Sequence, residues 1–147
     1  MTRFSPSVAP TWIRFGIVVA WALVLLFAAV SDPSGTGLSR SGPLGAFGFD
    51  KWLHAGGYAT FALLLAYALV PRWRGTRRGL IATLLLAGGY GIALEVLQQP
   101  LAYRSFDPAD ATANLLGAFV IVVVVALASR GTDWFRTGSQ SASGENR

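Results

Sequence analysis

The sequence contains no cysteine, which excludes disulfides, thiolate metal ligands and every thiol mechanism, including that of quinone-linked disulfide enzymes. It has a single histidine, whereas a membrane phosphatase of the phosphatidic-acid type needs two. A small drug exporter would carry an acidic residue near the middle of its first helix, and the apolar segment 15–30 has none. Three familiar classes of small membrane protein are therefore disfavoured.

Charged residues are also scarce, at 13% of 147 positions, while 53% of the residues are hydrophobic. This composition is too apolar for an ordinary soluble domain. A membrane core of roughly 30 Å requires about 20 apolar residues in a helix, and four stretches approach that length. We therefore predict an all-α membrane protein, a four-transmembrane-helix bundle with helices at about 12–30, 52–70, 79–98 and 108–129.

These helices form one predicted domain, residues 1–136. The first apolar stretch could be a signal peptide, but Val30-Ser31-Asp32-Pro33 is a poor cleavage site, so we expect it to remain as a helix. The segment 137–147 is polar without apolar periodicity, which predicts a disordered tail.

The orientation in the membrane follows from the distribution of arginine. The short segment 71–78 contains four arginines and no acid, which predicts a cytoplasmic loop. Both termini are then cytoplasmic, in agreement with Arg3, Arg14, Arg130 and Arg136 beside the first and last helices. The net charge of +5 therefore indicates orientation, and we expect no nucleic-acid partner. The connections 31–49 and 98–107 are expected outside.

Ten polar residues gather at the predicted outer ends of helices 2, 3 and 4. They are Asp50, Lys51, His54, Tyr58, Glu95, Gln98, Arg104, Asp107, Asp110 and Asn114. Spacings of three or four give one face on each helix, and these faces hold Asp50, His54 and Tyr58; Glu95 and Gln98; and Asp107, Asp110 and Asn114. Arg104 lies in the loop before the fourth helix. Ionisable groups at membrane depth cost roughly 2.5–3.5 kcal/mol each, so they normally face the bundle interior and find partners. We predict a single polar site that faces outside.

Simple structural roles compete with function at several of these positions. Asp50 and Asp107 are suitable helix caps, Asp110 complements the positive end of a helix, and Lys51 can extend to the headgroups. Asn114 lies a turn too deep for capping. His54 is the single histidine, and an imidazole can both accept and donate a proton, which suits proton transfer, but a lone membrane histidine is often only hydrogen-bonded.

The remaining candidates differ in strength. Glu95 is the hardest to dismiss, because it follows a long apolar run where a carboxylate needs a cation or a proton. Arg104 is either its counter-ion or a ligand for phosphate or carboxylate. Tyr58 and Gln98 are expected to complete a hydrogen-bond network.

Three blocks of sequence, taken together, resemble the VanZ-like family of bacterial membrane proteins. They are Asp50-Lys51-x-x-His54-x-x-x-Tyr58, Glu95-x-x-Gln98, and Arg104-Ser105-Phe106-Asp107-x-x-Asp110-x-x-x-Asn114-x-x-Gly117. The resemblance covers about residues 50–120. It implies a bacterial cytoplasmic-membrane protein of a family named for a glycopeptide-resistance cluster member linked to teicoplanin resistance, and it implies no particular reaction.

Two functions remain open from the residues. In the first, the chain binds or remodels an anionic amphiphilic cell-envelope component at the outer leaflet, which Lys51 and Arg104 would grip. In the second, it is an enzyme acting on a lipid-linked substrate, with Glu95 or Asp110 as general base and His54 as acid or base. Arg104 would then stabilise developing negative charge.

The expected partner is therefore a membrane lipid or a lipid-linked envelope component. A second copy of the chain or another membrane subunit could cover the polar face. We predict no cofactor and no metal, although Asp50, His54, Glu95 and Asp110 form a mixed set of ligands that suits several divalent cations.

Overall fold

The computed structural model describes residues 9–32, 41–45, 47–73, 77–103 and 106–141, and all its long elements are helices. These are α1 (Thr11–Val30), α2 (Phe49–Trp73), α3 (Arg77–Gln98) and α4 (Pro108–Ser141). A short 3₁₀ turn, η1 (Pro43–Gly45), precedes α2. Each long helix contains a stretch that is long and apolar enough to cross a membrane. The prediction of an all-helical chain with four candidate spans is confirmed.

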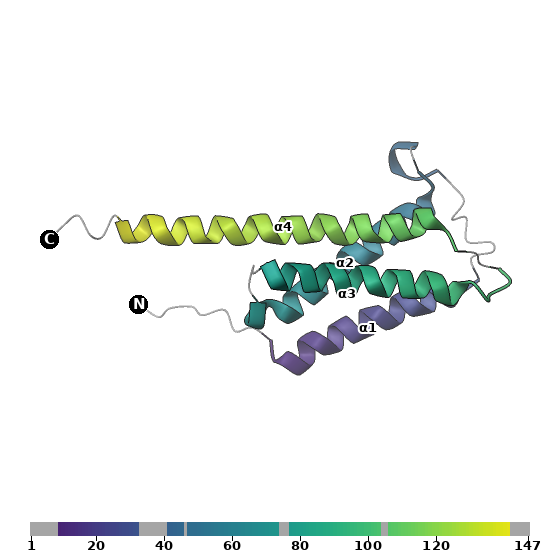
Figure 1. Cartoon of the computed structure of the whole chain (residues 1–147), viewed down its shortest axis with the longest axis horizontal. Helices are drawn as coiled ribbons and strands as arrows, with labels where there is room; N and C mark the ends of the chain where they lie inside the picture. Colours follow the sequence, from purple (N-terminus) through teal and green to yellow (C-terminus); the bar gives the residue numbers. More distant parts are fainter. Residues whose placement is uncertain (1–8, 33–40, 46, 74–76, 104–105, 142–147) are drawn as a thin grey trace.

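Helix α2 packs against all three other long helices (Figure 1). The end of α1, the start of α2, the end of α3 and the start of α4 lie together at one end of the bundle, on the right of Figure 1. We refer to this as the polar end. Helix α4 extends to Ser141 and so enters the segment 137–147 for which the sequence predicts disorder, while 142–147 lie outside the described residues.

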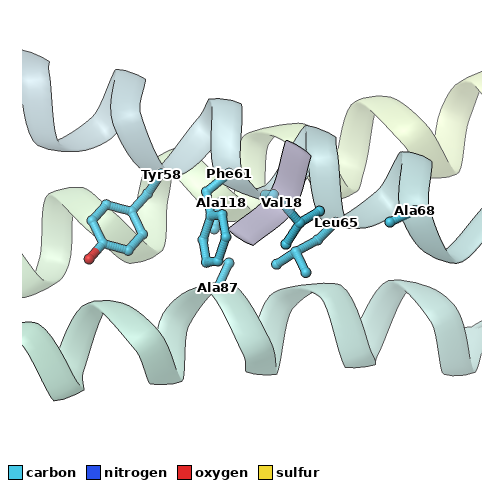
Figure 2. Close-up of a cluster of buried hydrophobic side chains, with 8 residues drawn as sticks. Val18, Tyr58, Phe61, Leu65, Ala68, Ala87 and Ala118 are labelled. Atoms are coloured by element: carbon cyan, nitrogen blue, oxygen red, sulfur yellow. The ribbon is translucent and has the colours of Figure 1, made fainter. Parts of the chain in front are cut away.

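The core between the helices consists largely of small side chains (Figure 2). Ala62, Ala87 and Ala118 are fully buried, and Phe61 and Leu65 pack beside them. Small residues allow helix backbones to approach closely, which is how helices associate where lipid removes the hydrophobic driving force.

Large apolar side chains cover the outside of the bundle. Phe27, Leu85 and Leu127 are exposed for 74%, 68% and 60% of their surface. Soluble proteins rarely expose so much contiguous apolar surface, whereas a lipid-facing surface requires it.

The closest approach between helices is that of α2 and α4. A Cβ added at Gly117 would lie 2.8 Å from the carbonyl carbon of Ala55 and closer still to its oxygen. Only glycine fits at this crossing. Gly117 lies about one turn after Asn114 on α4, and Ala55 directly follows His54 on α2, so the crossing sets the distance between the side chains of Asn114 and His54.

Hydrogen bonds to main-chain carbonyls fasten α1 to the other helices. Trp21 donates to the carbonyl of Gly57 (3.0 Å), and Tyr90 donates to that of Ala22 (2.7 Å). Arg14, which the sequence presents only as a marker of orientation, is 5% exposed and donates to the carbonyl of Ala68 at 2.8 Å. This bond satisfies a carbonyl near the end of α2 and places a buried charge at the end of the bundle opposite the polar end.

Candidate functional site

Lys51 binds three carboxylates, and two of them, from Asp107 and Asp110 at the start of α4, connect α2 to α4. Its Nζ lies 2.9 Å from Oδ2 of Asp50 and 2.6 Å from Oδ2 of Asp107, and it also donates to Oδ1 of Asp110. An ammonium group has three donors, and all three are used here. Lys51 is therefore neutralised within the chain, and it is not free to grip an anionic ligand in this arrangement.

Asp107 combines the two roles that the sequence leaves open. It directly precedes α4, and its Oδ1 accepts a hydrogen bond from the N–H of Ala109 at 2.8 Å, as a helix cap does. Its other oxygen binds Lys51. The hydrogen bond from Lys51, together with that from Ala109, holds the pKa of Asp107 below its ordinary value, so this carboxylate remains charged at neutral pH.

His54 lies one turn deeper, between two polar residues of α4. Its Nδ1 is 3.0 Å from Oδ1 of Asn114, and its Nε2 is 3.6 Å from Oδ2 of Asp110. Because an amide oxygen only accepts, this contact places the ring proton on Nδ1 and leaves the lone pair on Nε2. The imidazole is 24% exposed at its side chain, so a ligand can reach it.

Glu95 completes this group from α3. One carboxylate oxygen of Glu95, one of Asp110 and a ring nitrogen of His54 all lie within 4.8 Å of one another. Glu95 is only 1% exposed, and within the described part of the chain its Oε2 has no hydrogen-bond partner. A buried acceptor without a donor costs about 1–3 kcal/mol, so stability alone does not account for an acid at this position.

We define the acid–base centre as His54, Glu95, Asp110 and Asn114, one or two residues from each of three helices. The sequence predicts all four as site residues, and the structure places them together at the polar end. Asp50, Lys51 and Asp107 form a layer of charges nearer the end of the bundle, and Lys51 joins this layer to the centre through Asp110.

Of two further predicted site residues, Gln98 is engaged elsewhere, and Tyr58 lies where the acid–base centre borders the hydrophobic cluster. The amide of Gln98 is 3% exposed and donates to the carbonyl of Ala29 at 2.9 Å, which fastens α3 to α1. The Tyr58 ring is 3% exposed and lies in the hydrophobic cluster, edge-on to Phe61 (Figure 2). Arg104, the remaining candidate, lies outside the described residues.

Gly91 is a residue of the site that the sequence analysis does not single out. A Cβ at Gly91 would lie 2.9 Å from the Tyr58 ring and 3.2 Å from Asn114. Gly91 on α3 therefore provides the space that Asn114 occupies beside His54. Its position one turn before Glu95 is the signal in the sequence from which this role could have been inferred.

Comparison of the chain with models of protein families, with curated proteins and with solved structures gives no match. The resemblance to the VanZ-like family therefore stays a prediction from the three sequence blocks. The geometry at the polar end is the evidence that bears on function.

Proposed function

We propose that this chain acts on an amphiphilic component of the bacterial cell envelope at the outer leaflet, through the acid–base centre. The observation that carries the proposal is the buried Glu95 carboxylate, whose Oε2 has no partner among the described residues and which lies beside the accessible imidazole of His54. Unsatisfied buried polar groups are concentrated at functional sites, because stability selects against them elsewhere.

The centre suits hydrolysis or group transfer. The lone pair on Nε2 of His54 can accept a proton from a water molecule or a substrate hydroxyl, and the oxygen of that group then attacks an ester or phosphoester. The imidazolium is stabilised by the carboxylates of Glu95 and Asp110, both beside the ring, and returns the proton to the leaving oxygen. An amphiphilic substrate would place its headgroup at the polar end and its chains against the apolar sides of the helices.

The alternative is binding of an anionic headgroup without chemistry, which the sequence assigns to Lys51 and Arg104. It receives less support, because Lys51 is already bound by three carboxylates. The described polar end also has more negative than positive groups, which disfavours an anion. The glycopeptide susceptibility expected from the family resemblance is compatible with chemistry on an envelope lipid.

Activity is tested with protein reconstituted in vesicles of total envelope lipid, followed by mass spectrometry of the lipid species. We expect His54→Gln to slow conversion about 100-fold or more, the usual contribution of a general acid or base. Tyr103→Phe is the matched control, because it removes one hydrogen bond at the same end, to the carbonyl of Val30, without touching the centre. Equal conversion by wild type and His54→Gln would contradict the proposed role of His54.

The outward orientation of the polar end is a separate prediction, and the absence of cysteine makes it simple to test. Ala102→Cys, between α3 and α4, should react in intact cells with a maleimide that does not cross membranes. Ala9→Cys, before α1, should react only after the cells are opened. The reverse pattern of labelling would place the site in the cytoplasm and remove the outer leaflet from the proposal.

A further inference from the structure

Three groups able to ligate a metal converge from three different helices. His54 of α2, Glu95 of α3 and Asp110 of α4 each offer one ligand atom, and these atoms lie within 4.8 Å of one another. Imidazole nitrogen together with carboxylate oxygen is a donor set that suits divalent first-row metals such as Zn²⁺, Mn²⁺ and Fe²⁺. A cluster of carboxylates alone would not be sufficient evidence, since such clusters also occur without ions.

The second and independent observation is the state of Glu95. This side chain is 99% buried, and Oε2 finds no donor within the described ranges of the chain. A carboxylate removed from water needs a proton or a cation. Lys51, the described ammonium group at the polar end, does not supply that cation, because its three donors are already used by aspartates. A metal ion at the convergence point would satisfy Glu95.

Neighbouring side chains hydrogen-bond two of the three ligands, as neighbours of metal ligands in proteins usually do. Asn114 binds Nδ1 of His54, which leaves Nε2 with its lone pair towards Asp110. Lys51 binds Oδ1 of Asp110 and leaves Oδ2 on the side of the imidazole. In His54 and in Asp110, therefore, one polar atom is fixed by a hydrogen bond, and the other polar atom points to the proposed metal position.

The charges at the polar end also favour a cation. Its described residues include four carboxylates, from Asp50, Glu95, Asp107 and Asp110, against the single ammonium group of Lys51. With His54 neutral and all four acids ionised, the group carries a surplus of three negative charges. A divalent ion reduces that surplus and therefore lowers the cost of keeping these acids together.

We propose that His54, Glu95 and Asp110 bind one divalent transition-metal ion, with the remaining coordination positions open to water or a substrate oxygen. Metal–ligand bonds of about 2.0–2.2 Å hold three ligand atoms roughly 3–4 Å from one another, so atoms that now lie within 4.8 Å of one another must close by up to about 1–2 Å, which side-chain rotation can supply. The inference goes beyond the proposed function, because binding an ion requires neither substrate nor turnover. With an ion on Nε2, His54 would no longer be the base, and the ion would supply the activation of water in its place.

The experiment uses full-length protein carrying no polyhistidine tag, purified in detergent and treated with chelator. Zn²⁺ and Mn²⁺ are the probes, measured by titration calorimetry and by elemental analysis after dialysis. We expect one ion per chain. Glu95→Gln and Asp110→Asn should each weaken binding by more than about 100-fold, because even outer-shell losses cost about 10 to 100-fold.

Asp107→Asn is the matched control. It removes the same charge from the same end, and Asp107 contacts Lys51 and Ala109 but is not one of the three ligands. We expect its affinity to stay within about 10-fold of wild type, below the roughly 10- to 100-fold loss for groups that hold a ligand directly, because the Asp107 side chain reaches the ligands only through Lys51. Equal losses in Asp107→Asn and Glu95→Gln would overturn the site, since they would indicate attraction of cations to the acidic end in general.

Pulsed EPR of the Mn²⁺-loaded wild type tests whether His54 coordinates the ion, and it needs no variant that could fail to fold. The spectrum should contain the coupling of one coordinated imidazole nitrogen, which only His54 can supply in this chain. Binding of less than one ion per chain for both metals, or a Mn²⁺ spectrum without that nitrogen, would overturn the proposal. Neither result depends on lipid conversion, so failure of the metal site and failure of the proposed function are distinguishable.

Discussion

Gly117→Ala is expected to separate α2 from α4 and to destabilise the bundle by about 3 kcal/mol or more, the upper part of the range for overpacking. The added methyl group meets the main chain of Ala55, which cannot move aside as a flexible side chain would. The helices must shift apart, and the contacts of Lys51 and His54 with α4 are lost with them. Unfolding in a graded series of SDS and detergent mixtures measures the change.

Gly56→Ala serves as the control for this prediction. Gly56 is the residue after Ala55 on α2, and a Cβ added there has nothing within 4 Å. Its replacement should change stability by less than about 1 kcal/mol, because only helix propensity is affected. Equal stability of Gly117→Ala and Gly56→Ala would show that the close crossing of α2 and α4 does not hold the site together.

Replacing Glu95 is expected to separate stability from activity. Glu95→Met should leave the metal-free protein as stable as wild type or raise its stability by about 1–3 kcal/mol, because an apolar side chain of similar size removes a buried carboxylate whose Oε2 lacks a partner and gives up only the hydrogen bond from the main chain of Asp107. The same change should abolish lipid conversion. The measurement is SDS unfolding of chelator-treated protein beside the lipid assay.

A loss of stability in Glu95→Met would contradict this account. It would mean that Glu95 holds the helices together, for example through a partner outside the described residues. Glu95→Gln keeps the shape of the side chain and one of its oxygens. Its stability therefore indicates whether the loss in Glu95→Met comes from the missing charge or from the changed shape.

The membrane segments could be predicted closely because hydropathy alone identifies them. The predicted starts and ends of α1 and α3 lie within two residues of those in the structure. Helix α2 begins at Phe49, earlier than its apolar run, because Asp50 and Lys51 continue the helix into the polar end. Helix α4 continues to Ser141, since hydropathy marks where a membrane span ends and not where a helix ends.

The composition of the acid–base centre could also be anticipated. Spacings of three and four residues placed Asp110 and Asn114 on one face of α4, and His54 on the face of α2 that begins with Asp50. What spacing could not predict is how each helix is rotated against its neighbours. The spacing of four residues places Tyr58 on the same face of α2 as His54. It does not indicate that the Tyr58 ring enters the hydrophobic cluster.

The sequence also could not predict which residues on neighbouring helices the polar side chains bind. Lys51 and Gln98 both have long side chains that reach several neighbours, and only the packing decides among them. Lys51 binds three aspartates instead of remaining available for a ligand, and Gln98 reaches back to α1. Arg14 and Trp21 donate to main-chain carbonyls. Every residue has such a carbonyl, so no pattern in the sequence indicates which one accepts.

The most direct test of the central claim compares cells that carry the wild type, Glu95→Gln or no protein, with equal membrane levels of both proteins confirmed by blot. The measurement is the profile of envelope lipids together with glycopeptide susceptibility. The account predicts that Glu95→Gln matches the cells without the protein and that the same lipid species accumulates in both. A Glu95→Gln profile identical to wild type would contradict it, because Glu95 would then be structural and simple binding would be the better explanation.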